Sequence, residues 1–161
     1  MNRRISAPML LLTASVMAAS SWAHEYKQGD ISVLHPYSSP TPPGVKVSAG
    51  YFEVINNGET DDRLVGAQTT IADTVSMHRS QMDGDVAQMR EMKDGVQIAA
   101  GDTFTLTPGS HHLMFEGLTI QLVPEYRFTV TLEFEDAGSI DVEFVVEQPA
   151  EPEIVDHSKM H

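Results

Sequence analysis

Residues 127–134 read Arg-Phe-Thr-Val-Thr-Leu-Glu-Phe, and residues 140–147 read Ile-Asp-Val-Glu-Phe-Val-Val-Glu. In both stretches apolar side chains alternate with polar ones, which is the period of a β-strand with one face in a core and the other in water. A helix would instead repeat its apolar residues every three to four positions. The two stretches therefore predict two regular strands near the end of the domain.

The preceding chain is divided into similar short segments. Further strands are predicted over residues 31–35, 46–56, 64–69, 74–82, 85–92, 111–116 and 118–122, with a short one at Phe104 and Leu106. Turn-forming dipeptides separate several of them, as at Asn57-Gly58, Asp83-Gly84 and Pro108-Gly109. No stretch after residue 23 has a convincing helical period, so the chain predicts an all-β domain, either a β-sandwich or a small barrel.

The first 23 residues have the pattern of a secretory signal peptide. A basic start at Arg3-Arg4 precedes the apolar run from Ala7 to Ala19, and Ser21-Trp22-Ala23 fits a cleavage site. The run is too short to span a membrane. We therefore expect export to the periplasm, by the Sec route as the default, because Arg3-Arg4 alone is thin support for the twin-arginine route.

Cleavage after Ala23 leaves a domain over residues 24–147 and a tail over residues 148–161. Prolines and charged residues dominate the tail and its periodicity stops, so we expect it to be flexible. Cleavage removes two arginines and no acidic residue, which moves the formal net charge from −13 to −15. Such a charge disfavours nucleic acid and anionic lipid as partners. Most of the carboxylates are interpreted as a solubilising surface.

The soft donors of the mature chain are concentrated in one window. There is no cysteine, so the chain has no disulfide, no thiolate ligand and no cysteine for a lipid anchor. Six methionines remain after residue 23, and five of them lie between Met77 and Met114, together with three of the seven histidines. Thioether sulfur and imidazole nitrogen are ligands that suit Cu(I).

The strand pattern predicts that four of these residues form two pairs. If Asp83 and Gly84 are the two turn residues of a hairpin, Met82 faces Asp85 and His78 lies directly opposite Met89, with Cβ atoms about 5 Å apart. His112 and Met114 are two positions apart on another strand and share a face.

A lone histidine or methionine on a strand is more often a surface or core residue, but two such pairs favour a metal site. Two imidazoles and two thioethers favour Cu(I) over Zn(II), and the missing cysteine disfavours a blue-copper centre. The same register puts Met77 and Met92 on the opposite face as core residues. Met82, beside the turn, is either an outer methionine or simply exposed.

The four residues match the signature of the PCuAC family of periplasmic copper chaperones. That signature is a histidine, a methionine eleven positions later and then a His-x-Met motif, here His78, Met89, His112 and Met114. The chain is similar to the family in further segments: His35-Pro36-Tyr37, Thr41-Pro42-Pro43-Gly44, Gly50-Tyr51, Asn56-Asn57-Gly58, Asp62-Arg63-Leu64, Pro108-Gly109 and Phe115-Glu116-Gly117-Leu118.

The resemblance covers nearly all of residues 31–147. It implies a cupredoxin-like Greek-key β-sandwich or barrel that binds Cu(I) and passes it to an acceptor, typically the CuA centre of cytochrome c oxidase. We expect the protein to be a monomer and not an enzyme. Tyr37 stands where tryptophan is common, and His111 where an aromatic residue is common. Neither departure removes a ligand. In an extended strand the side chain of His111 would point away from that of His112. His111 is therefore interpreted as a neighbour of the ligands or as a surface residue.

The remaining histidines suggest an accessory site. His24 would be the mature N-terminus and would offer an amine and an imidazole, and the tail ends in His157, Met160 and His161. Imidazoles and an amine suit Cu(II), and similar tails in the family point the same way. The tail can equally be an inert polar end. His35 precedes a proline and is interpreted as structural.

Three other functions remain open. One is copper buffering or resistance, without delivery to a specific acceptor. Another is a copper-dependent enzyme, in which a terminal histidine and a second imidazole activate oxygen, although no substrate surface is evident and a four-ligand site would be closed to oxygen. The third is a metal-free interaction module, a common role of β-sandwiches. Copper stoichiometry and turnover assays would distinguish these functions.

Overall fold

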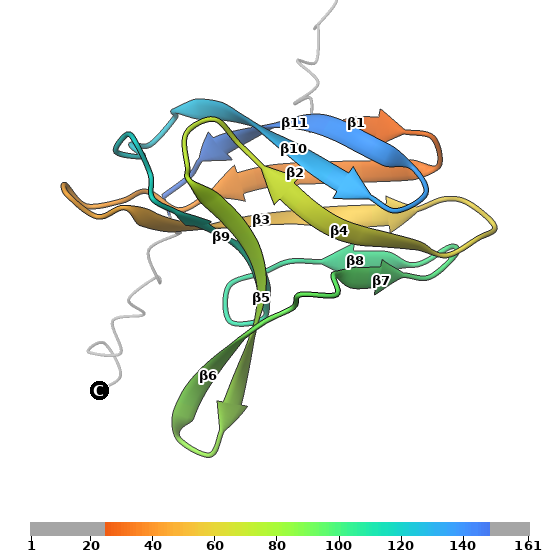
Figure 1. Cartoon of the computed structure of the whole chain (residues 1–161), viewed down its shortest axis with the longest axis horizontal. Helices are drawn as coiled ribbons and strands as arrows, with labels where there is room; N and C mark the ends of the chain where they lie inside the picture. Colours follow the sequence, from red (N-terminus) through yellow and green to blue (C-terminus); the bar gives the residue numbers. More distant parts are fainter. Residues whose placement is uncertain (1–24, 149–161) are drawn as a thin grey trace, which may run out of the picture.

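β-Strands form the whole regular structure of residues 25–148, the part of the chain that the computed structural model describes (Figure 1). They are β1 (Glu25–Gln28), β2 (Ile31–Ser38), β3 (Val47–Asn56), β4 (Asp62–Gln68), β5 (Thr74–Asp83), β6 (Val86–Glu91), β7 (Val96–Ile98), β8 (Thr103–Thr105), β9 (His111–Glu116), β10 (Arg127–Phe134) and β11 (Gly138–Val146). Within this range no helix is long and apolar enough to cross a membrane. The expected signal peptide, His24 and residues 149–161 lie outside the described residues.

One continuous hydrogen-bonded path connects the strands. Its order is β6-β5-β9-β3-β2-β11-β10-β4-β7, with β1 added to β2 and β8 added to β3. Strands β2 and β11 run parallel, and the other pairs are antiparallel. The path curls so that β4 contacts β5 and β7 contacts β3, although neither pair shares a ladder. This closure encloses a single core, and it confirms the prediction of an all-β domain.

The alternating residues of β10 and β11 form the centre of that core. Their apolar side chains face each other in register, with Phe128 opposite Phe144 and Val130 opposite Val142. The ring of Phe144 is fully buried and packs against Phe128, Phe115 and Phe52, with ring centroids 5.7, 5.8 and 6.0 Å away. Gly50 on β3 makes room for this cluster, since a Cβ there would lie 2.6 Å from the Phe115 ring.

The strand expected over residues 118–122 is not present. Leu118 and Leu122 are buried as the apolar pattern suggested, but the segment is a loop that follows Gly117, whose φ is 69°. Its backbone N–H groups donate to three separate segments: Leu118 to the Lys46 carbonyl, Thr119 to the Ile71 carbonyl and Leu122 to the Thr41 hydroxyl. The apolar pattern that predicted a strand therefore reflects buried leucines in a loop. The short strands β1 and β7 were not predicted.

The β5–β6 hairpin extends beyond the rest of the sheet (Figure 1). Its two turn residues are Gly84 and Asp85, flanked by the pair Asp83 and Val86, so the prediction of an Asp83-Gly84 turn is wrong. Within the turn only Gly84 has a positive φ, of 61°. That is the pattern of a type II′ turn with glycine first, whereas an Asp83-Gly84 type I′ turn would need a positive φ at both residues.

The corrected turn changes the pairing along the hairpin. His78 lies opposite Glu91, Met89 lies opposite Ser80, and Met82 lies opposite Ala87 rather than Asp85. The predicted direct pairing of His78 with Met89 is therefore wrong by two residues. Because side chains alternate with a period of two, a shift of two leaves Met89 on the same face of the hairpin as His78.

Candidate metal centre

Strands β5 and β9 bring the two expected histidines together. His78 lies directly opposite His112, with ring centroids 5.8 Å apart and ring planes inclined by 16°. Ser76 lies opposite Met114 in the same ladder, so Met114 is diagonal to His78 on the same face. Residues far apart in sequence thus place two imidazoles and a thioether on one face of two adjacent strands. This neighbourhood of β5 and β9 could not be derived from the hairpin alone.

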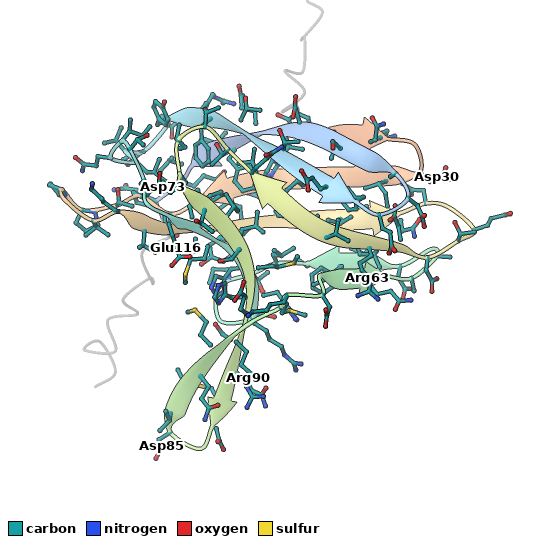
Figure 2. All side chains as sticks on the ribbon, in the orientation of Figure 1. Asp30, Arg63, Asp73, Asp85, Arg90 and Glu116 are labelled. Carbon is teal, nitrogen blue, oxygen red and sulfur yellow. The ribbon has the colours of Figure 1, made fainter. Side chains whose placement is uncertain are left out.

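Met89 reaches this face from the edge strand β6. It lies opposite Ser80, two pairs nearer the tip of the hairpin than His78, so Met89 and His78 are diagonal neighbours on one face. Diagonal neighbours have Cα atoms about 7–8 Å apart, which long side chains can bridge. The Met89 side chain is 52% exposed, and sulfur atoms lie around the base of the hairpin in Figure 2. Met89 is therefore the most open of the four predicted ligands.

One nitrogen of His78 has no hydrogen-bond partner. The Nε2 atom lies 2.9 Å from the Ser76 hydroxyl. The Nδ1 atom is buried, and among the described residues nothing donates to it or accepts from it. Buried polar atoms almost always have a partner in a folded protein, so each exception needs an explanation. A metal ion bound to Nδ1 would supply the missing partner.

His112 is 5% exposed, and its surroundings favour the neutral ring. Burial lowers the pKa of His112 below its usual value, and the neighbouring His78 lowers it further, partly opposed by a hydrogen bond to the Ser110 backbone. A histidine must be deprotonated to bind a metal ion. The surroundings of His112 therefore favour the deprotonated ring that a metal ion can bind.

The lowered pKa predicts that the metal-free protein loses stability on acidification. In the unfolded chain His112 titrates near 6.5, so between that value and the lower folded pKa the unfolded state binds more protons. The free energy of unfolding should then rise with pH through this window and fall as pH drops below about 6.5. Urea unfolding between about pH 5 and 8 measures this slope, and His112→Gln should make it shallower.

A second histidine sets the control for that experiment. Burial and the nearby Arg79 also lower the pKa of His111, so part of the slope should remain in His112→Gln. His35→Gln is the control for removing a histidine as such, because it removes a side chain that is 63% exposed. An unchanged slope in His112→Gln would contradict the assignment of the pH dependence to that ring.

The other methionines and histidines of the window lie where the strand pattern places them. Met77 is buried and Met92 packs against the core, whereas Met82 is 65% exposed near the hairpin tip. His111 lies on the other face of β9, with its ring 4.9 Å from that of Phe104. Outside the window, His35 sits in β2 at a φ of 47°, and its Nε2 lies 3.4 Å from a carboxylate oxygen of Glu147.

Two polar neighbours of His78 were not predicted. Ser76 shares its face two positions earlier on β5, and Glu91 lies directly opposite on β6. The rule that residues i and i+2 share a face of a strand would have found Ser76. A hairpin turn with Gly84 as its first residue would have predicted that Glu91 lies opposite His78. Within residues 25–148, however, no three histidine or carboxylate side chains are grouped to hold an ion, so a metal at this face needs the thioethers.

Comparisons with known proteins agree with the fold. The model of one family, described as "Putative lipoprotein LpqE-like", matches residues 31–146. The chain belongs to this LpqE-like family. A curated relative, "Putative lipoprotein Lxx21020" of Leifsonia xyli, is 32% identical over 99 residues. That match covers 62% of the LpqE-like chain and 60% of the relative, so it spans about three fifths of the relative's length.

Solved structures of PCuAC domains share the fold of this LpqE-like chain. The copper-bound PCuAC domain from PmoF2 is 25% identical with a TM-score of 0.67, covering 78% of the chain and 99% of that domain. The apo PCuAC domain from PmoF1 is also 25% identical, with a TM-score of 0.66 and coverages of 78% and 100%. CuI-DR1885 from Deinococcus radiodurans, at 24% identity, a TM-score of 0.60 and coverages of 83% and 85%, shows the fold alone. The predicted resemblance to PCuAC proteins and the cupredoxin-like sandwich are confirmed.

Proposed function

We propose that this protein is a copper chaperone that binds one Cu(I) through His78, Met89, His112 and Met114. The observation that carries the proposal is the unpartnered, buried Nδ1 of His78 beside the ring of His112. The sheet adds Met114 and Met89 on the same face. Neutral nitrogen and sulfur donors without a thiolate suit Cu(I), and the copper bound to the related PmoF2 domain supports the same cargo.

The unequal exposure of the ligands suggests how the ion leaves. His112 is almost completely buried, whereas Met89 on the edge strand is half-exposed. An acceptor can approach from the Met89 side and replace that thioether first, while the two imidazoles still hold the ion. Such stepwise exchange needs no free ion in solution. It favours a carrier over an enzyme.

The proposed acceptor is a periplasmic copper protein, with the CuA centre of cytochrome c oxidase as the first candidate. The test loads the mature protein with Cu(I) under reducing conditions, measures stoichiometry by chelator competition, and mixes it with a soluble apo-CuA domain. We expect one Cu(I) per chain and faster transfer to the CuA domain than to a chelator of equal affinity. Tight binding with no preference for the CuA domain would favour buffering, and no binding would refute the proposal.

Export and cleavage before His24 remain part of the proposal. They place the protein in the periplasm and give the mature chain a free amine at His24, next to β1 (Glu25–Gln28). The mass of the protein recovered from the periplasm tests both points. We expect a chain that begins at His24, and recovery of the full-length chain from the cytoplasm would contradict the assignment.

We also propose an accessory Cu(II) site formed by His24, His157, Met160 and His161. Gln148, the last described residue, lines a cavity of about 440 Å³ with Tyr37 and Tyr51. Tyr51 follows Gly50, the partner of Leu113, so the chain leaves the domain on the His112 side of the sheet. Residues 149–161 can span about 40 Å when extended, which is enough to return to the copper-binding face.

Removing the tail should change Cu(II) binding and leave Cu(I) binding nearly intact. Imidazole and amine donors suit Cu(II), whereas the thioethers of the domain suit Cu(I). Paramagnetic resonance of the mature protein should show nitrogen-ligated Cu(II), and truncation after Glu147 or His24→Ala should alter the spectrum. Identical spectra and Cu(II) affinities in all three proteins would contradict the accessory site.

A further inference from the structure

Ser76 and His78 form a side-chain pair on one face of β5. The Ser76 hydroxyl oxygen lies 2.9 Å from Nε2 of His78, and both residues are half-buried. Ser76 is also the ladder partner of Met114. The serine therefore lies between two of the proposed ligands without being a good ligand for a soft ion itself, since hydroxyl oxygen is a hard donor.

The hydrogen bond has two possible directions, and they leave His78 in different states. A neutral imidazole carries one N–H group and one lone pair. If the serine donates to Nε2, then Nδ1 carries the hydrogen and is a buried donor without an acceptor. If Nε2–H donates to the serine, Nδ1 carries a lone pair in the same buried position. A metal ion can satisfy the second arrangement and not the first.

We propose that Ser76 is a positioning residue that accepts a hydrogen bond from Nε2–H of His78 and so presents Nδ1 to Cu(I). The inference rests on the proposed copper function only for the identity of the ion. A half-turn of the ring about the Cβ–Cγ bond would put carbon in front of the serine oxygen and break the bond, so Ser76 also fixes the ring orientation. Metal-binding histidines commonly have their second nitrogen held by such a partner.

The tautomer can be read directly in the metal-free protein. Long-range ¹H–¹⁵N correlation spectra distinguish the Nε2–H, Nδ1–H and doubly protonated forms of an imidazole ring. We expect the Nε2–H form of His78 in the wild type and a mixture of both forms in Ser76→Ala. An Nδ1–H tautomer in the wild type would overturn the proposal, whether or not any variant folds.

Affinity supplies the second measurement. Loss of the outer partner of a histidine ligand costs about 10–100-fold in metal affinity, so Ser76→Ala should weaken Cu(I) binding by that factor. Ser76→Thr keeps the hydroxyl on a strand-favouring residue and should restore the affinity and the tautomer. Ser80→Ala is the matched control, because Ser80 lies on the same face two positions after His78 and makes no side-chain hydrogen bond to a histidine among the described residues.

The two measurements separate this inference from the proposed function. If the wild type shows Nε2–H but binds no Cu(I), the copper function fails and the role of Ser76 in fixing the ring stands. If copper binds tightly and Ser76→Ala changes neither the tautomer nor the affinity, the positioning role is refuted and the copper function stands. An equal loss of affinity in Ser80→Ala would also refute it, since a general effect on β5 would then explain both.

Discussion

Replacing Met89 and Met114 together with leucine should abolish tight Cu(I) binding. The two thioethers are the soft donors of the proposed site, and leucine offers no lone pair. We expect the affinity to fall by more than about a hundredfold, beyond the loss seen when only an outer partner of a ligand is removed. Exchange of methionine for leucine costs less than about 1.5 kcal/mol of stability even in a core, so the fold should remain. Chelator competition measures the affinity.

The matched control is Met82→Leu. Met82 lies on the same face of the hairpin, opposite Ala87, and is 65% exposed. Its replacement should leave the Cu(I) affinity unchanged, and X-ray absorption of the loaded protein should still show sulfur scatterers. The double variant should lose them. If the double variant binds Cu(I) as tightly as the wild type, the site lies elsewhere in the chain.

The sequence predicted the face of this site better than its contacts. Alternation predicted that His112 and Met114 share one face of β9, and the structure has both on the face of His78. The hairpin register was wrong, yet Met89 stayed on the predicted face because the error was an even number of residues. An error of one residue would have moved Met89 to the side of Arg79. Face assignments are thus more robust than register assignments.

The contact between His78 and His112 depends on a pairing that local sequence does not encode. Strand β9 follows β5 after three other strands, yet it lies next to β5 in the sheet. Such neighbours are decided by how the whole core packs, here by Met77 and Leu113 facing inward from paired positions. Residues 118–122 were misassigned for the same reason. The burial of Leu118 and Leu122 was predicted correctly, but local sequence did not indicate which distant groups would accept the backbone hydrogen bonds of this segment.

The ligand-bearing face of β9 depends on the aromatic cluster on its other face. Phe115 lies between Met114 and Glu116 in the chain and points into the core, where its ring packs edge-on against Phe144 at an interplanar angle of 88°. Gly50 leaves the space that this ring occupies beside β3. The core therefore fixes the strand that carries two of the four proposed ligands, and a defect in the cluster should disturb the proposed copper site.

Phe144→Ala should produce the largest loss of stability among single substitutions considered for this domain. The ring is fully buried and contacts three other aromatic rings, from β3, β9 and β10. Truncating a buried phenylalanine costs about 3–5 kcal/mol of the free energy of unfolding, a large part of the roughly 5–15 kcal/mol that stabilises a typical domain. Urea unfolding of the metal-free protein measures the loss, and the melting temperature should fall by roughly 10–20 °C.

The control for this variant is Tyr126→Ala, at the exposed edge of the same cluster. Tyr126 stacks on Phe128 at 6.4 Å but is 39% exposed, so its truncation should cost about 1 kcal/mol or less. Cu(I) affinity should fall in Phe144→Ala, because β9 loses the support of Phe115, and should persist in Tyr126→Ala. Equal losses of stability in the two variants, or full Cu(I) affinity in Phe144→Ala, would contradict the dependence of the site on this core.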